Sequence, residues 1–161
     1  MSFTEVFADD PASRWRFFTD TVMGGVSSGT IAFHSEPNQR FARMTGLVST
    51  ANNGGFIQMQ MQMKKPLSAG GQGVRLIARG NDKRYFIHLR SVRTRLPMAF
   101  YRASFDAVPD WQEIRLGFHA FSASIPALPA RIVPEDIAAI AVVASGQDYE
   151  ADISVSEIGF Y

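Results

Sequence analysis

Basic and amide side chains recur at alternate positions in several segments of this sequence, and they are the groups best suited to binding chemistry. The basic residues are Arg75, Arg79, His88, Arg90 and Arg102, and the amides are Gln58, Gln60 and Gln62. Alternate residues of a β-strand point to the same face of a sheet. Guanidinium groups bind carboxylates, phosphates and acidic peptide segments through paired, planar hydrogen bonds. The pattern predicts one polar sheet face that binds an anionic partner. The alternative is that these residues only solvate the outside of a sheet.

Positive charge is concentrated in the middle of the chain. Residues 64–116 contain 11 Lys and Arg against 4 Asp and Glu, although the net charge of the whole chain is only +1. Such an excess indicates an anionic partner or an acidic protein surface. Nucleic acid is disfavoured as a specific partner, because most aromatic residues of this segment alternate into the expected core and cannot stack on bases.

Two pairs of adjacent glycines stand next to polar residues. The segments are Asp20-Thr21-Val22-Met23-Gly24-Gly25-Val26-Ser27 and Asn53-Gly54-Gly55-Phe56. Tandem glycines permit positive φ or close approach of another backbone segment, and no helical pattern follows them, which disfavours a phosphate-binding loop. We expect crowded turns that Asp20 and Asn53 cap or cross-link through hydrogen bonds from backbone N–H groups to their side chains. The alternative is that both residues belong to the rim of a ligand site, although they supply too few oxygens for calcium.

No arrangement of residues indicates catalysis. The sequence has no cysteine, which excludes a thiolate nucleophile and a cysteine zinc site. Its histidines, His34, His88 and His119, are scattered and lack the spacing of metal ligands, and no G-x-S-x-G elbow follows a strand. We therefore expect a protein that is not an enzyme, with no catalytic residue, metal site or cofactor.

Length and composition fit a globular protein that folds without disulfides. The 161 residues are 46% hydrophobic and 19% charged. We expect a single domain over residues 1–161, with residues 1–12 as a loosely attached or edge-docked lead. The N-terminus carries acids where a leader would carry bases, and no window reaches the roughly 18 apolar residues of a membrane span. The expected location is therefore the cytoplasm.

Apolar and polar residues alternate in about ten short segments separated by turn signals. They are residues 14–17, 29–34, 40–49, 56–63, 74–78, 85–89, 98–105, 111–118, 139–145 and 153–160. The segment 56–63 alternates most clearly, with its methionines opposite its glutamines. Gly24-Gly25 has the spacing of a two-residue hairpin loop, and Pro134–Ile137 is compatible with at most one short helical turn. We expect an all-β fold, an antiparallel sandwich or jelly roll, with Trp15 and Trp111 in its core.

Several of these residues occur in a characteristic order. They are Trp15, Asp20-x-Val22-Met23-Gly24-Gly25-Val26-Ser27, Asn53-Gly54-Gly55-Phe56, Tyr85-x-Ile87-x-Leu89-Arg90, Tyr101-x-Ala103-x-Phe105 and Trp111. In this order they resemble the complex I intermediate-associated protein 30 (CIA30) family. The resemblance runs from Trp15 to Tyr161 and indicates a bacterial, stand-alone member.

The resemblance implies a galactose-binding-like jelly roll and an assembly or chaperone-like role for respiratory complex I. Its partners would be respiratory-complex subunits or assembly factors, through which the chain reaches the inner membrane. The same fold is familiar from carbohydrate-binding modules. A module that binds a carbohydrate or a small anionic ligand is therefore the alternative function.

Overall fold

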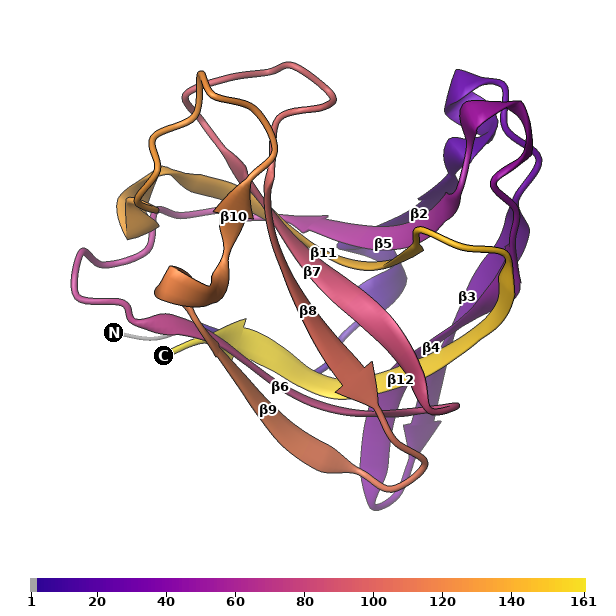
Figure 1. Ribbon diagram of the computed structural model, residues 1–161. Helices are drawn as coiled ribbons and strands as arrows, with labels where there is room; N and C mark the ends of the chain where they lie inside the picture. The colour runs from indigo at the N-terminus through magenta and orange to yellow at the C-terminus, as the bar shows by residue number, and fades with distance from the viewer. Residues whose placement is uncertain (1–2) are drawn as a thin grey trace.

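The alternating segments form antiparallel strands in the computed structural model of the protein, which describes residues 3–161 (Figure 1). The longer strands are β2 (Trp15–Thr19), β3 (Ser28–Glu36), β4 (Gln39–Val48), β5 (Phe56–Gln62), β6 (Gly73–Gly80), β7 (Lys83–Ser91), β8 (Tyr101–Ala107), β9 (Gln112–Gly117), β11 (Ile137–Ser145) and β12 (Tyr149–Phe160). Two strands of two residues, β1 (Thr4–Glu5) and β10 (Ser122–Ala123), bring the total in this part of the chain to twelve. The all-β, antiparallel prediction is confirmed.

Within the described residues, five single turns of 3-10 helix connect the strands. They are η1 (Pro11–Ser13), η2 (Asp20–Met23), η3 (Ala51–Asn53), η4 (Phe118–Ala120) and η5 (Pro134–Asp136). Only η5 is expected from the sequence, because turns of three or four residues are too short to leave a periodic pattern. No α-helix forms within residues 3–161. In the same range no helix is long and apolar enough to cross a membrane.

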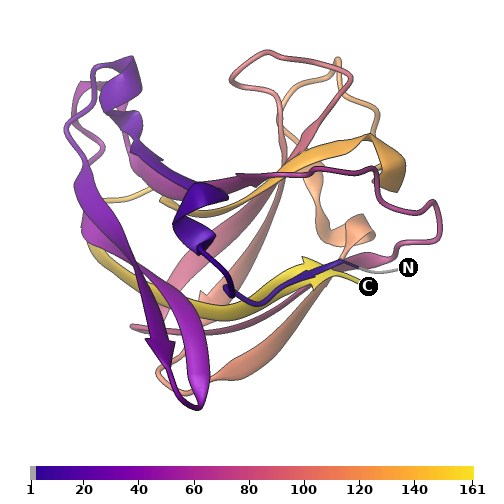
Figure 2. The same ribbon diagram turned by 180° about the vertical axis from the view of Figure 1, so that it is seen from behind.

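The strands pack as two layers. Sheet A has the order β3-β4-β12-β6-β9, and sheet B has the order β10-β8-β7-β11-β5-β2. Figure 1 shows sheet B above sheet A, and Figure 2 shows from behind how the N-terminal segment runs beside the end of β12, with which β1 pairs. The chain crosses repeatedly between the layers. The turn after β6, for example, carries it from sheet A to β7 in sheet B.

The core fills the space between the inner faces of the two sheets. Sheet A contributes Met44, Leu76, Ile153 and Ile158, and sheet B contributes Ile57, Met59, Tyr85, Ile87, Leu89 and Ile140, each less than 2% exposed. The methionine side of β5 therefore points inward, as its alternation predicts. Trp15 is also buried in this core and is 5% exposed.

Trp111 lies outside this core, which corrects the expectation for it. The residue is half-buried, and its ring meets that of Phe41 edge-on, with centroids 5.6 Å apart. The Arg79 guanidinium lies 4.6 Å from the centroid of the Trp111 ring. The reason is strand register. Gln112 pairs with Ala78, which points inward from β6. Trp111, the residue before Gln112, therefore lies beside Arg79, which points outward.

The two glycines after Met23 do not form the predicted hairpin loop. The residues before them form η2, and Gly24 follows with φ 88°. Strand β2 belongs to sheet B and β3 to sheet A, so the segment is a crossing between layers. Thr19 favours the helical turn because its hydroxyl accepts a hydrogen bond from the Thr21 N–H at 3.1 Å.

Candidate functional site

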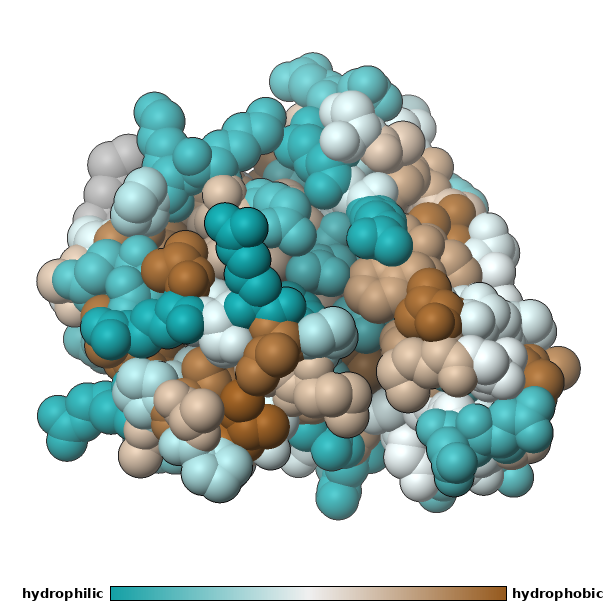
Figure 3. All heavy atoms as spheres, turned by 90° about the horizontal axis from the view of Figure 1, so that it is seen from above, coloured by the Kyte–Doolittle hydropathy of each residue, from teal (hydrophilic) through white to brown (hydrophobic). Residues whose placement is uncertain are grey.

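Sheet B presents its outer face between two sets of loops. In Figure 1 the segments around residues 20–27 and 49–55 rise beyond one end of the sheet, and those around 92–100 and 124–134 rise beyond the other. Figure 3, which views the molecule from above, shows hydrophilic and hydrophobic side chains interspersed on this side.

Strand register arranges the side chains of this face in rows. One row contains Arg16, Gln60, Ala141, His88, Arg102 and Ser122, the next contains Phe18, Gln58, Val143, Phe86 and Ser104, and a third contains Gln62, Ala139 and Arg90. The intervening residues point into the core. The structure thus brings together five residues of the predicted site: Gln58, Gln60, His88, Arg90 and Arg102.

His88 lies at the centre of the face and is only 8% exposed. Its ring stacks on that of Phe100, with centroids 4.0 Å apart and planes 9° apart. Burial, together with the charges of Arg102 and Arg90, lowers the pKa of His88 to about 3. The ring is therefore neutral at pH 7 and offers one donor and one acceptor.

Neither ring nitrogen of His88 has a hydrogen-bond partner within residues 3–161, and the same is true of the Gln58 side-chain oxygen. Gln58 is 4% exposed. Buried polar atoms are normally paired, because an unpaired one costs about 1–3 kcal/mol. Three unpaired buried atoms therefore mark this face as a place where a water molecule or a partner would supply hydrogen bonds.

Arginines line the face around His88. The Arg102 guanidinium lies 3.6 Å from the centroid of the Phe86 ring, that of Arg16 lies 4.8 Å from the Phe18 ring, and Arg90 donates to the Pro97 carbonyl at 3.0 Å. No carboxylate within residues 3–161 forms an ion pair with Arg16, Arg90 or Arg102. Burial lowers the pKa of Arg90 and of Arg102, yet both remain charged at neutral pH.

Phe86 and Phe100 are site residues that the sequence prediction missed. Both are half-buried and support Arg102 and His88 through their rings. Their place on this face could have been predicted from residue spacing. Phe86 lies two residues before His88, and Phe100 lies two residues before Arg102, so each points to the same face in an extended chain. The prediction instead treats the aromatic residues of this segment largely as core.

Arg75 and Arg79 do not belong to this face, so the prediction of a single face that includes them is wrong. Both lie on β6, on the outer face of sheet A. Arg75 forms ion pairs with Glu113 at 3.0 Å and with Glu157 at 3.2 Å. Alternation within a strand predicts which face a side chain points to, but it does not predict which sheet the strand joins. The turn after β6 leads the chain from sheet A to sheet B.

Asp20 joins the two glycine segments, as predicted. Its buried carboxylate accepts hydrogen bonds from the Ser27 N–H at 2.9 Å, the Ser27 hydroxyl at 2.5 Å, the Gly55 N–H at 2.5 Å and the Phe56 N–H at 3.2 Å. Burial by itself would raise the pKa of Asp20, but these hydrogen bonds outweigh it and hold the pKa below its ordinary value. The carboxylate is a structural cross-link with no exposed surface for a ligand.

The glycines beside this carboxylate are explained by close approach. A Cβ atom would lie 2.4 Å from the Asp20 carboxyl carbon at Gly25 and 2.5 Å from an Asp20 oxygen at Gly54. Asn53 does not share the predicted capping role, since its exposed side chain forms no hydrogen bond within residues 3–161. Its neighbour Asn52 instead donates to the Gly24 carbonyl at 3.3 Å.

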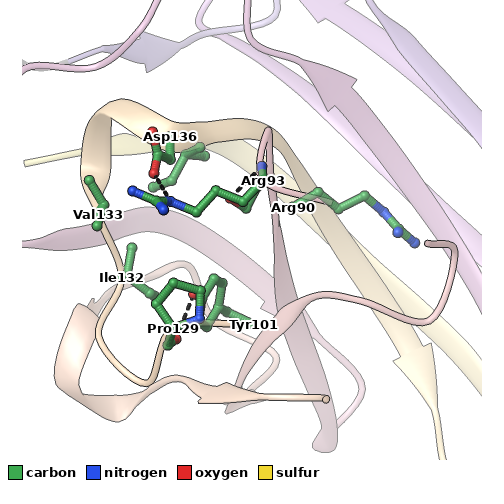
Figure 4. Close-up of a pocket in the computed structure, with 9 residues that line it drawn as sticks. Arg90, Arg93, Tyr101, Pro129, Ile132, Val133 and Asp136 are labelled. Carbon is green, nitrogen blue, oxygen red and sulfur yellow. Dashed lines mark hydrogen bonds and ion pairs between the residues drawn. The ribbon is translucent and has the colours of Figure 1, made fainter. Parts of the chain in front are cut away.

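The loop around residues 124–134, which borders the other end of the face, is held against the sheet by side-chain contacts (Figure 4). The Tyr101 hydroxyl donates to the Pro129 carbonyl at 2.7 Å, and Arg93 pairs with Asp136. The cavity between these residues has room for little more than one water molecule. Figure 4 shows Arg90 pointing away from it. This cavity therefore belongs to the support of the face and is too small for a ligand.

Comparisons with known proteins agree with the fold. The complex I intermediate-associated protein 30 (CIA30) family model matches residues 4–154. No curated protein matches the chain. Among solved structures, a family 11 carbohydrate-binding module from Clostridium thermocellum, in complex with a β-1,3-1,4-mixed-linked tetrasaccharide, has a TM-score of 0.76 at 11% identity. The match covers 99% of this chain and 94% of the module.

Two further solved structures share the fold. A family 30 carbohydrate-binding module has a TM-score of 0.59 at 11% identity over 83% of this chain and 91% of the module. An exo-β-agarase has a TM-score of 0.63 at 7% identity, covering 99% of this chain but only 25% of the enzyme. At these identities the likeness establishes the β-sandwich architecture and leaves ligand and activity to the residues of the site.

Proposed function

The chain belongs to the complex I intermediate-associated protein 30 family, and on that premise we propose that it is a non-catalytic binding domain for a protein partner. The partner is an assembly intermediate or assembly factor of respiratory complex I, as the family name suggests, and it brings the chain to the inner membrane from the cytoplasm. The outer face of sheet B is the binding surface.

The observation that carries this proposal is the set of unsatisfied groups on the face. His88 and Gln58 bury polar atoms without partners, and Arg16, Arg90 and Arg102 carry charges that no carboxylate of residues 3–161 balances. A partner with acidic and hydrogen-bonding groups would satisfy both. The arginines and half-buried rings are also residue types enriched in protein interfaces.

The same groups support binding more than catalysis. A general base works best with a pKa near the operating pH, whereas the pKa of His88 is about 3. The buried carboxylate of Asp20 is fully occupied by donors of its own chain. We therefore propose that the protein holds its partner without transforming it.

A glycan is the second candidate ligand. The likeness to carbohydrate-binding modules, one of them in complex with a tetrasaccharide, favours it. The glutamines at alternate positions of β5 (Gln58, Gln60 and Gln62) favour it as well. Against it, Arg102 covers the Phe86 ring and His88 stacks on the Phe100 ring, so the aromatic faces on which a sugar would stack are already in contact.

Capture experiments separate the two candidates. The tagged protein, used as bait in cells of its source organism, should recover complex I subunits or assembly factors identified by mass spectrometry. A glycan array and a thermal-shift screen with oligosaccharides should give no response. Recovery of no respiratory protein, together with a saturable oligosaccharide response, would replace the first proposal by the second.

A further inference from the structure

The basic cluster on sheet B has a definite composition. His88 pairs in register with Arg102 on β8, and Arg90 follows two residues later on β7 and points to the same face. The neutral imidazole is thus flanked by two guanidinium groups. Half-buried phenylalanine rings border the cluster, since Phe86 packs on Arg102 and Phe100 on His88.

No carboxylate within residues 3–161 pairs with the arginines of this cluster. On sheet A, Arg43 forms an ion pair with Asp152 at 2.7 Å, and Arg75 pairs with Glu113. Arg79 of the same sheet lies over the Trp111 ring instead. A negatively charged group on a partner would supply the counter-charge that Arg90 and Arg102 lack.

A carboxylate fits the donors better than a phosphate does. Its two oxygens accept from planar guanidinium forks, and the neutral His88 ring adds a single N–H donor. Phosphate sites commonly add backbone N–H groups from a helix N-terminus or a glycine-rich loop. Here His88, Arg90 and Arg102 lie on strands, and the loop 92–100 beside them contains no helix and no glycine. The phenylalanine rings suit the methylene groups of an acidic side chain.

The adjacent strand β5 offers groups that suit an extended main chain. Gln60 is half-buried and Gln62 is exposed, and neither side chain has a hydrogen-bond partner within residues 3–161. Alternate residues of a strand lie about 7 Å apart, which is also the repeat of an extended peptide. Ala139 and Ala141 on β11 lie between these amides and the basic cluster. Because their side chains are small, they leave space over β11 for a bound segment.

We propose that Arg90, His88 and Arg102 form the docking site for a carboxylate of an aspartate or glutamate in an extended acidic segment of the protein partner, with Gln60 and Gln62 binding its main chain. The inference rests on the proposed function, since it names the chemistry that the partner presents. It adds that the partner is recognised through an acidic side chain in an extended segment.

The test uses a synthetic peptide in which glutamate alternates with glycine, and three comparison probes: the glutamine counterpart, the phosphoserine counterpart and inorganic phosphate. Nuclear magnetic resonance titration of the labelled full chain follows the His88 ring and the Arg90 and Arg102 Nε–H signals. The glutamate peptide should shift these signals saturably, and the glutamine peptide should not. Tighter binding of either phosphate probe, or shifts confined to sheet A, would overturn the proposal.

Substitutions test which side chains of the cluster bind the glutamate peptide. Arg90→Gln and Arg102→Gln should each weaken binding of the glutamate peptide about tenfold, and His88→Phe, which retains a flat ring, should weaken it severalfold through loss of the N–H donor. Arg40→Gln, an exposed change on sheet A, should have no effect. The amide spectra of all variants report whether they fold. Equal binding by Arg102→Gln and the wild type would contradict the assignment.

The outcomes also separate this inference from the proposed function. Capture of respiratory proteins without binding of the glutamate peptide would reject the carboxylate site and leave the proposed function standing. Binding of the peptide at the cluster without capture of any respiratory protein would retain the anion site and reject the proposed partner.

Discussion

At the scale of single residues, one carboxylate organises both glycine motifs. Asp20 receives hydrogen bonds from two segments that lie about thirty positions apart in the sequence. The sequence predicts that Asp20 and Asn53 cap or cross-link the two glycine turns, because Asx residues commonly bind backbone N–H groups. It does not predict that Asp20 alone serves both turns, since that depends on how the segments meet in space.

Asp20→Asn should destabilise the fold strongly. The amide places N–H donors against backbone N–H groups that need an acceptor, so the free energy of unfolding should fall by about 3 kcal/mol or more. Urea denaturation measures the change. Asp152→Asn, which removes an exposed ion pair with Arg43, is the matched control and should cost less than about 1 kcal/mol. Equal losses in the two variants would contradict the cross-link.

His88 should make stability depend on pH. Its pKa falls to about 3 in the folded state, so the unfolded chain binds the extra proton first as the pH drops. The stabilisation is fully present above the ordinary pKa of about 6.5 and should decrease by roughly 1.4 kcal/mol per pH unit between 6.5 and 3. His88→Phe should remove this slope in urea denaturation series. Phe100→Ala, which exposes the ring, should reduce it, and an unchanged slope in both variants would argue against a buried neutral imidazole.

At the scale of elements, alternation predicts which way a side chain points but not which sheet receives it. The alternation over residues 56–63 correctly separates Met59 and Met61 from the glutamines of the site. The same reasoning fails for Arg75 and Arg79. The segment Gly80-Asn81-Asp82-Lys83 has the composition of a turn between neighbouring strands, but it connects β6 in one sheet to β7 in the other. Sheet membership is decided by long-range packing, which local pattern does not encode.

The crossing between β2 and β3 gives a prediction at this scale. Gly25→Ala should destabilise the protein by roughly 1–3 kcal/mol, because the new Cβ would overlap the Asp20 carboxyl group. Thermal and urea unfolding measure the loss. Gly70→Ala, at a position with no atom near the added Cβ, is the control and should be nearly neutral. Combining Gly25→Ala with Asp20→Ala should give less than the sum of the single losses, because the overlap is then absent; strict additivity would point to another cause.

At the scale of the whole molecule, paired and unpaired arginines are distributed unevenly over the two outer faces. Arg43 and Arg75 on sheet A and Arg84 on sheet B pair with carboxylates. Other strand arginines form no ion pair within residues 3–161, namely Arg16, Arg90 and Arg102 on sheet B and Arg40 and Arg79 on sheet A. The sandwich architecture and the family follow from the sequence with little help from the structure. Which arginines lack an ion pair cannot be predicted from the sequence, because ion pairing depends on contacts between strands that are distant in the chain.

The most direct measurement of the binding surface compares two charge reversals of equal size. Arg90→Glu combined with Arg102→Glu on sheet B, and Arg40→Glu combined with Arg115→Glu on sheet A, each change the net charge by the same amount. Both variants are used as bait beside the wild type, with circular dichroism as the check of folding. We expect the sheet B variant to lose capture of the respiratory partner and the sheet A variant to retain it. Retained capture by a folded sheet B variant would show that the outer face of sheet B is not the binding surface.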